Sequence, residues 1–235
     1  PKEVAVTEKV ICVVGPTATG KTKMGVALAQ RFDGEVVSVD SMQIYRGMAV
    51  GTAAPTAEEM EGVPHHMIGV ADPWESWSAA RFTEAADACV QDILRRGKRP
   101  ILVGGTGLYL DALLRGIDFA AGSQDTPLRR QLQERLRREG AEALLEELRR
   151  IDPDSAARLH LRDEKRILRA LEVYQETGET ITQHDRRTRE QPPRYEGLFI
   201  GLNFQDRQDL RDRIDRRVDD MVAQGLLDEV RSLLQ

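Results

Sequence analysis

The spacing of apolar and polar residues predicts alternating strands and helices over the N-terminal part of the chain. An apolar run at 10–14 is followed by apolar residues at helical spacing over 21–32, and then by a second apolar run at 35–39. Another helical pattern, over 79–96, leads into a third apolar run at 100–103. Two strands joined through a helix need a crossover connection, so this order predicts an α/β fold with a parallel sheet flanked by helices.

Glycines are expected to end two of these helices. Gly34 follows the first helical pattern and Gly97 follows the second, and each precedes an apolar run. Glycine most readily adopts the left-handed conformation with which many helices terminate. We therefore expect the first helix to end at Gly34 and the second to end at Gly97.

The pattern changes in the middle of the chain, where Arg, Glu and Leu recur at helical spacing without a strand-like run. Pro127 is predicted to open a helix, Gly140 to interrupt it, and Gly178 to close a later one. Apolar residues at 197–202 then predict another strand. One long helical segment is expected from Arg207 to the last residue.

These changes divide the chain into three predicted segments. Residues 1–120 form the first part of a core, 121–190 form a helical insertion subdomain, and 191–235 return to the core. The last helical segment carries no signal for a helix C-terminus. That feature predicts that the C-terminal part of the core is truncated.

The first apolar run leads into a glycine-rich phosphate-binding motif, G-x-x-x-x-G-K-[ST], which opens the first helix. Glycines let the backbone form a cradle of N–H donors, the lysine adds a mobile positive charge, and the hydroxyl of Thr22 can be a ligand of Mg²⁺. The match predicts a P-loop NTPase-like core that holds a phosphate chain. The predicted diphosphate-binding residues are Gly15, Pro16, Thr17, Ala18, Thr19, Gly20, Lys21 and Thr22.

Two polar residues follow the other predicted strands. Asp40 comes after the second apolar run and Thr106 lies just past the third, so both are expected to converge on the phosphate loop. The third strand ends in Gly-Gly-Thr, without the Asp that helps many ATP-hydrolysing enzymes to hold Mg²⁺, which disfavours ATP hydrolysis. Asp40 could take a proton from a substrate, or it could simply cap a helix together with Ser41.

Composition and charge exclude some classes of protein. No segment approaches the roughly 20 consecutive apolar residues of a membrane span, and the polar N-terminal residues do not resemble a signal peptide. Two cysteines cannot build a disulfide framework, so we expect a cytoplasmic protein. The net charge of −5 argues against general polyanion binding, and the helical insertion is the less acidic part of the chain.

The order of motifs along the chain resembles one enzyme family. The chain carries, in this order, GPTATGKT, DSMQIYR, GTAAP, HHMI, SAARF, GGTGLYLDALLRG and RALEVYQETG. Together they resemble the tRNA dimethylallyltransferases, also called tRNA isopentenyltransferases. The resemblance implies Mg²⁺-dependent transfer of a dimethylallyl group from dimethylallyl diphosphate to N6 of the adenine 3′ of the anticodon in tRNA. We expect a monomer without a membrane partner.

The resemblance also implies roles for single residues. Asp40 would be the general base that accepts the N6 proton, Thr106 would contact the reacting centre, and Arg217 would reach the diphosphate. Gln43 could read the extruded adenine, because its amide offers the paired donor and acceptor that suit this base. The helical insertion would clasp the anticodon stem-loop. The predicted tRNA-binding residues are Asp40, Ser41, Met42, Gln43, Arg129, Lys165, Arg166 and Arg169.

Three other functions stay open. A prenyltransferase acting on free adenine nucleotides would use the same loop but would not need the insertion. A small-molecule P-loop kinase would bind ATP there, and should show a clearer Mg²⁺ carboxylate and a cluster of lid arginines. A non-catalytic RNA-binding module is disfavoured because Lys21, Thr22, Asp40 and Thr106 are all present.

Overall fold

The computed structural model describes residues 8–105, 107–117 and 126–235. The chain divides into two compact units. The first comprises Pro1–Gly116 and Pro193–Gln235, and the second comprises Ile117–Pro192. Each unit has a hydrophobic core of its own.

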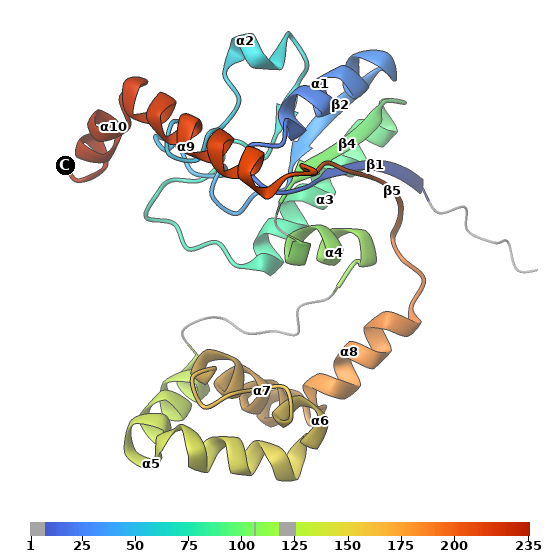
Figure 1. The fold of residues 1–235 in the computed structure, drawn as a ribbon. Helices are drawn as coiled ribbons and strands as arrows, with labels where there is room; N and C mark the ends of the chain where they lie inside the picture. The colour runs from blue at the N-terminus through green and yellow to red at the C-terminus, as the bar shows by residue number, and fades with distance from the viewer. Residues whose placement is uncertain (1–7, 106, 118–125) are drawn as a thin grey trace, which may run out of the picture. The chain divides into compact units, whose positions relative to one another are not determined.

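The first unit is organised around a parallel β-sheet that has five strands among the described residues. In chain order they are β1 (Glu8–Val14), β2 (Gly34–Ser38), β3 (His65–His66), β4 (Arg99–Gly104) and β5 (Tyr195–Gly201). Hydrogen-bonded neighbours follow the order β3-β2-β4-β1-β5, and the paired strands all run parallel (Figure 1). The predicted parallel α/β sheet is therefore confirmed, although the short strand β3 gave no signal in the hydrophobic pattern.

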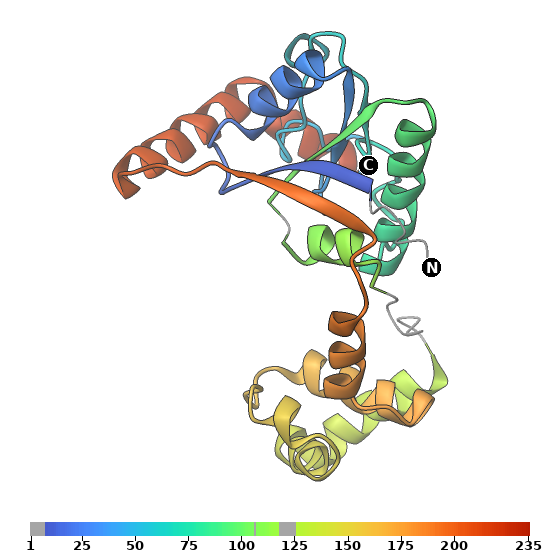
Figure 2. The same ribbon diagram turned by 90° about the vertical axis from the view of Figure 1, so that its right-hand side faces the viewer.

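Helices cover both faces of this sheet. α1 (Lys21–Arg31) packs on one face, whereas α3 (Ala79–Arg95) and α4 (Gly107–Arg115) pack on the other (Figure 2). Side chains alternate along a strand, so consecutive residues serve opposite faces. Val36 packs in the cluster beneath α1, and Val37 packs in the cluster beneath α3.

The first helix ends differently from the prediction. The left-handed residue that turns the chain after α1 is Asp33 (φ 48°), not Gly34. Gly34 is the first residue of β2, where a Cβ atom would lie 2.6 Å from the carbonyl oxygen of Arg99. Its missing side chain therefore serves strand packing rather than helix termination. Gly97 (φ 74°) follows α3 in the left-handed conformation, as predicted.

The C-terminal helical segment is broken, whereas the sequence predicted one long helix. It forms α9 (Arg207–Ala223) and α10 (Leu226–Leu233), which are separated by Gly225 in the left-handed conformation (φ 98°). Glycine adopts this conformation without steric cost, so the chain can change direction there. A further single turn, α2 (Ala57–Met60), lies between β2 and β3.

The described elements of the second unit are all helices. Leucine and isoleucine side chains of its first and third helices share one core with Ala156 of the second helix. Gly140 (φ 83°, ψ 161°) kinks the first helix and Gly178 (φ 72°) closes the third, which confirms both glycine predictions. None of the helices in the described ranges has the length and hydrophobicity of a bilayer-spanning segment. The helices of this unit are α5 (Pro127–Ile151), α6 (Pro153–Ala156), α7 (Glu164–Thr177) and α8 (Ile181–Glu190).

A buried carboxylate ties β2 to its neighbours. Glu35 is 3% exposed, and its two oxygens accept hydrogen bonds from Arg96 at 2.5 and 2.8 Å. The ring of His66 on β3 lies 2.7 Å from the same carboxylate. Hydrogen bonding to the Arg96 guanidinium lowers the pKa of Glu35 to about 2, against the effect of burial, which raises it. The network therefore stabilises the amino-terminal half of β2.

Candidate active site

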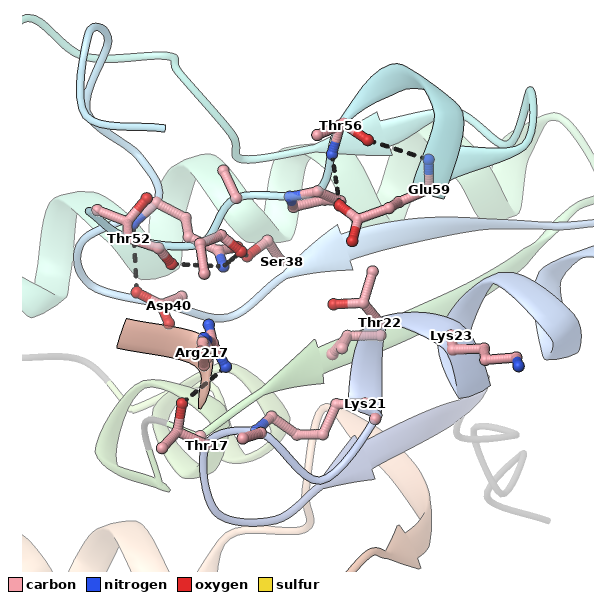
Figure 3. A pocket seen from close by; sticks show the side chains of 18 of the residues that line it. Thr17, Lys21, Thr22, Lys23, Ser38, Asp40, Thr52, Thr56, Glu59 and Arg217 are labelled. Atoms are coloured by element: carbon pink, nitrogen blue, oxygen red, sulfur yellow. Dashed lines mark hydrogen bonds between the residues drawn. The ribbon is translucent and has the colours of Figure 1, made fainter. Parts of the chain in front are cut away.

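The carboxyl ends of β1, β2 and β4 border a cleft of about 1050 Å³ in the first unit (Figure 3). β1 leads into the phosphate loop, β2 leads into Asp40, and β4 ends at Gly104. These ends lie at one edge of the sheet because the strands are parallel. Residues of the segments 49–56 and 59–68 and one face of α9 also line the cleft. The cleft thus gathers residues that lie far apart in the sequence.

One wall of the cleft is the phosphate loop, 15–22. Gly15 has φ 152°, and a Cβ atom there would lie 2.3 Å from the carbonyl oxygen of Leu202, so only glycine fits. Gly20 (φ 89°) is the N-cap of α1 and has no side chain that could satisfy the first backbone N–H groups of the helix. These donors, together with the positive end of the helix dipole, suit an anion such as a diphosphate.

Lys21 folds back over this loop. Its Nζ donates to the carbonyl oxygen of Pro16 at 2.6 Å, and the Thr19 hydroxyl donates to the same oxygen at 2.8 Å. Burial lowers the pKa of Lys21, the positive charge of Arg217 lowers it further, and the negative charge of Asp40 opposes the shift. The three charged groups therefore share one electrostatic environment. A bound anion would favour the charged ammonium form of Lys21.

Arg217 reaches the phosphate loop from α9. Its guanidinium donates to the hydroxyl of Thr17 at 2.9 Å, so two segments at opposite ends of the chain meet in the cleft (Figure 3). The other cleft-lining residues of this helix and its C-cap were not predicted from the sequence. Arginines at positions i, i+3 and i+4 share one helix face, and this spacing was the signal that could have identified two of them. The missed residues are Arg213, Arg216, Asp220, Met221 and Gln224.

The other wall begins at Asp40. Its Oδ1 accepts hydrogen bonds from the backbone N–H groups of Met42 at 2.8 Å and Gln43 at 3.2 Å. This is a capping arrangement, as the alternative interpretation of Asp40 expected, but the residues that follow form a turn and not a helix. Both bonds go to Oδ1 and fix the orientation of the carboxylate, so Oδ2 keeps its capacity to accept a proton from a substrate.

Gln43 uses its side-chain amide within the protein. Oε1 accepts a hydrogen bond from the Ser38 hydroxyl at 2.9 Å, and Nε2 donates to the carbonyl oxygens of Thr52 and Ala53, both at 3.3 Å. The predicted adenine-reading role requires that these bonds be exchanged for bonds to the base. Two further predicted tRNA-binding residues lie in the same loop: Ser41 is half-buried and Met42 is exposed.

β2 and β4 approach each other closely where they meet the cleft. A Cβ atom on Gly104 would lie 2.0 Å from the carbonyl oxygen of Val39, so only glycine allows this approach. The contact brings the segment after β4 to the sheet edge that carries Asp40. Thr106, the remaining predicted catalytic residue, lies outside the residues that the structure describes.

Oxygen ligands suited to Mg²⁺ line the cleft next to α1. The Thr22 hydroxyl and the Asp40 carboxylate both border it. Among the described residues, no group of three or more His, Cys, Asp or Glu side chains forms a potential metal site. This donor set fits Mg²⁺, which keeps several water ligands and is commonly bound by one or two protein oxygens together with substrate phosphates.

The predicted tRNA-binding residues of the second unit fall into two groups. Arg129 and Arg169 donate to the carboxylate of Glu172, which is 2% exposed, at 3.4 and 3.1 Å. The Arg129 pair joins α5 to α7 at the edge of the unit's core, whereas the Arg169 pair lies within α7. Lys165 and Arg166 are instead exposed on α7. Arg129 and Arg169 therefore have a structural role as well, whereas Lys165 and Arg166 lie at the surface.

Two family models match the chain. The model described as IPP transferase matches residues 43–235, and the model described as isopentenyl transferase matches residues 8–68. The chain is 50% identical over 228 residues to tRNA dimethylallyltransferase 1 of Pelobacter propionicus, and 48% identical over 227 residues to tRNA dimethylallyltransferase of Geobacillus thermodenitrificans. These alignments cover 97% of this chain and 73% and 71% of the two relatives.

Solved structures give the same result. The full-length tRNA isopentenylpyrophosphate transferase of Bacillus halodurans matches with a TM-score of 0.66 and 45% identity over 97% of this chain and 70% of that chain. A eukaryotic dimethylallyltransferase acting on tRNA matches with a TM-score of 0.83 and 34% identity over 97% of this chain and 56% of that chain. From the motifs, the fold and these matches, we conclude that the chain belongs to the IPP transferase family.

Proposed function

We propose that this protein transfers the dimethylallyl group of dimethylallyl diphosphate to N6 of the adenine 3′ of the anticodon in tRNA, and releases diphosphate. The observation that carries the proposal is the meeting of Lys21, Asp40 and Arg217 in one cleft beside a phosphate loop. The family relatives named tRNA dimethylallyltransferase support the choice of both substrates.

The phosphate-loop wall would handle the leaving group. Lys21, Arg217 and the N–H groups at the start of α1 would bind the diphosphate, with the remaining residues of 15–22 shaping the loop. Positive charge held there stabilises the negative charge that develops on the diphosphate as its bond to carbon breaks. Mg²⁺ bound by the Thr22 hydroxyl would neutralise further charge on the diphosphate.

The opposite wall would handle the nucleophile. In the transfer, the N6 nitrogen forms a bond to C1 of the dimethylallyl group, the bond from C1 to the diphosphate oxygen breaks, and one N6 proton must leave. Oδ2 of Asp40 would accept that proton, while Oδ1 stays bonded to the N–H groups of Met42 and Gln43. Thr106 would contact the reacting centre, and Gln43 would read the edge of the extruded adenine.

The second unit would hold the anticodon stem-loop. Its exposed Lys165 and Arg166 can contact RNA phosphates, and Arg129 and Arg169 would contact the RNA beside their ion pairs with Glu172. An enzyme for free adenine nucleotides would have no use for such a unit. We propose a monomer acting in the cytoplasm.

Transfer of radiolabel from dimethylallyl diphosphate tests this function. The acceptor is an unmodified anticodon stem-loop with adenine 3′ of the anticodon, in the presence of Mg²⁺, and the control stem-loop carries guanine at that position. We expect label on the adenine stem-loop alone. Label on adenosine monophosphate would instead support a nucleotide prenyltransferase, and ATP consumption without label transfer would support a kinase.

A further inference from the structure

The segment 48–54 in the wall beyond Asp40 forms one isolated helical turn. The N–H group of Thr52 donates to the carbonyl oxygen of Met48 at 3.1 Å, and that of Ala54 donates to the carbonyl oxygen of Ala49 at 2.9 Å. Most residues of the turn line the cleft. A single turn is unstable by itself, because its first N–H groups and last carbonyl groups have no partners within the turn.

Side chains from two other segments satisfy both ends of this turn. At its beginning, the N–H groups of Val50 and Gly51 donate to the two carboxylate oxygens of Glu229 on α10, both at 2.8 Å. At its end, the carbonyl oxygens of Thr52 and Ala53 accept hydrogen bonds from Nε2 of Gln43. A negative group at the first N–H groups and a donor at the last carbonyl groups match the partial charges of a helical turn.

α10 packs directly against the turn at this cap. A Cβ atom on Gly51 would lie 3.2 Å from Oε1 of Glu229 and 3.3 Å from Cδ1 of Leu226. The turn is linked in the other direction through Gln43, whose backbone N–H donates to Oδ1 of Asp40. A continuous series of hydrogen bonds therefore connects α10, the turn 48–54, Gln43 and Asp40.

We propose that Glu229 is a positioning residue that caps the turn 48–54 and thereby fixes the wall that carries Gln43 and Asp40. The proposal rests on the proposed function of the cleft. Glu229 does not line the phosphate loop, and α9 contacts that loop through a different residue, Arg217. Loss of the carboxylate therefore loosens the nucleophile side of the cleft and leaves the diphosphate side intact.

The test compares Glu229→Ala and Glu229→Gln with the matched control Asp228→Asn. Asp228 is exposed on the same helix and pairs with Arg231. In Glu229→Ala we expect amide hydrogen exchange at Val50 and Gly51 to accelerate about 10-fold or more, and kcat on the stem-loop to fall about 10-fold, because two charge-assisted hydrogen bonds are lost. The KM for dimethylallyl diphosphate stays within about twofold, since the phosphate loop keeps its contacts.

Rescue by the isosteric variant separates positioning from general destabilisation. Glu229→Gln keeps one acceptor oxygen, so its exchange rates and kcat should lie between those of wild type and Glu229→Ala. Asp228→Asn should behave as wild type in both measurements. If Glu229→Ala does not fold, Glu229→Gln alone tests the proposal. The expected result is amide hydrogen exchange at Val50 and Gly51 that is faster than in the wild type.

Three outcomes would overturn the proposal: unchanged exchange at Val50 and Gly51, an equal loss of kcat in Asp228→Asn, or a rise in the KM for the diphosphate that matches the fall in kcat. The exchange measurement needs no catalysis. A wild-type protein that transfers no label would therefore refute the proposed function, while the cap formed by Glu229 would still be tested by the exchange rates.

Discussion

The two walls of the cleft are built in opposite ways. The phosphate-loop wall is one continuous run, 15–22, shaped mainly by its own glycines and by the strand and helix on either side, although Leu202 and Arg217 also contact it. The wall formed by Asp40, Gln43 and the turn 48–54 is held by side chains from other segments, among them Glu229 on the last helix. A wall whose conformation depends mainly on adjacent residues can be recognised in the sequence as a motif. A wall held by residues that are distant in the sequence can be identified only from the folded structure.

The largest expected effect is a fall in kcat, and it distinguishes the proton-accepting wall at Asp40 from the diphosphate-binding wall. Asp40→Asn keeps an oxygen for the N–H groups of Met42 and Gln43 but cannot accept a proton, so kcat for transfer should fall by about 10²–10⁴-fold. Affinity for dimethylallyl diphosphate, measured by calorimetry, should stay near that of wild type. The control is Asp72→Asn, which removes the charge from a carboxylate paired with Arg46 outside the cleft. Wild-type turnover in Asp40→Asn would remove this residue as the base.

The converse change weakens the phosphate-loop wall. Arg217→Ala removes a charged donor 2.9 Å from Thr17, which should raise the KM for dimethylallyl diphosphate by about 10–100-fold, corresponding to about 1.5–3 kcal/mol. Steady-state kinetics with a saturating stem-loop measures the effect. Arg211→Ala, on the same helix but away from the cleft lining, is the matched control. An Arg217→Ala enzyme with wild-type KM would place this arginine outside the diphosphate site.

Stability measurements test how closely the strands beneath the two walls must approach. In Gly104→Ala the added Cβ atom would meet the Val39 carbonyl oxygen at 2.0 Å, so we expect the free energy of unfolding to fall by about 1–3 kcal/mol. In Gly105→Ala the corresponding atom has ordinary contact, 3.5 Å from the Gly15 carbonyl oxygen, and should change stability by less than about 0.5 kcal/mol. Urea denaturation of both variants provides the comparison, and equal stabilities would contradict it.

The smallest expected effect concerns the far end of β2. Because the folded-state pKa of Glu35 is about 2 and its ordinary value is 4.5, its contribution to stability is present above pH 5 and is lost as the pH falls toward 2. Glu35→Gln should lower the free energy of unfolding by about 1–2 kcal/mol at pH 7. The difference from wild type should shrink between pH 5 and pH 2. Urea denaturation across this range measures it, and a constant difference would show that the charge of Glu35 is unimportant.

The fold followed from the sequence wherever one segment determined its own structure. The apolar runs of β1, β2 and β4, the helical spacing of α1, and the kink at Gly140 were all predicted, since each depends on neighbours along the chain. Tertiary contacts overrode local signals elsewhere. Gly34 serves packing against the Arg99 backbone instead of ending a helix. The break at Gly225 has a local cause, the left-handed conformation of this glycine, but only the structure shows that it lets α10 reach the turn 48–54.

The same distinction holds for the candidate site. The sequence by itself determined the phosphate loop and the placement of Asp40 at a strand end, because a glycine-rich motif and a parallel sheet leave little choice of geometry. Only the tertiary structure decided that Gln43 bonds to the turn 48–54, that Arg129 and Arg169 pair with Glu172, and that Glu229 caps that turn. Hydrogen bonds and ion pairs between distant residues depend on where the fold places them, and no periodicity or spacing along the chain records that placement.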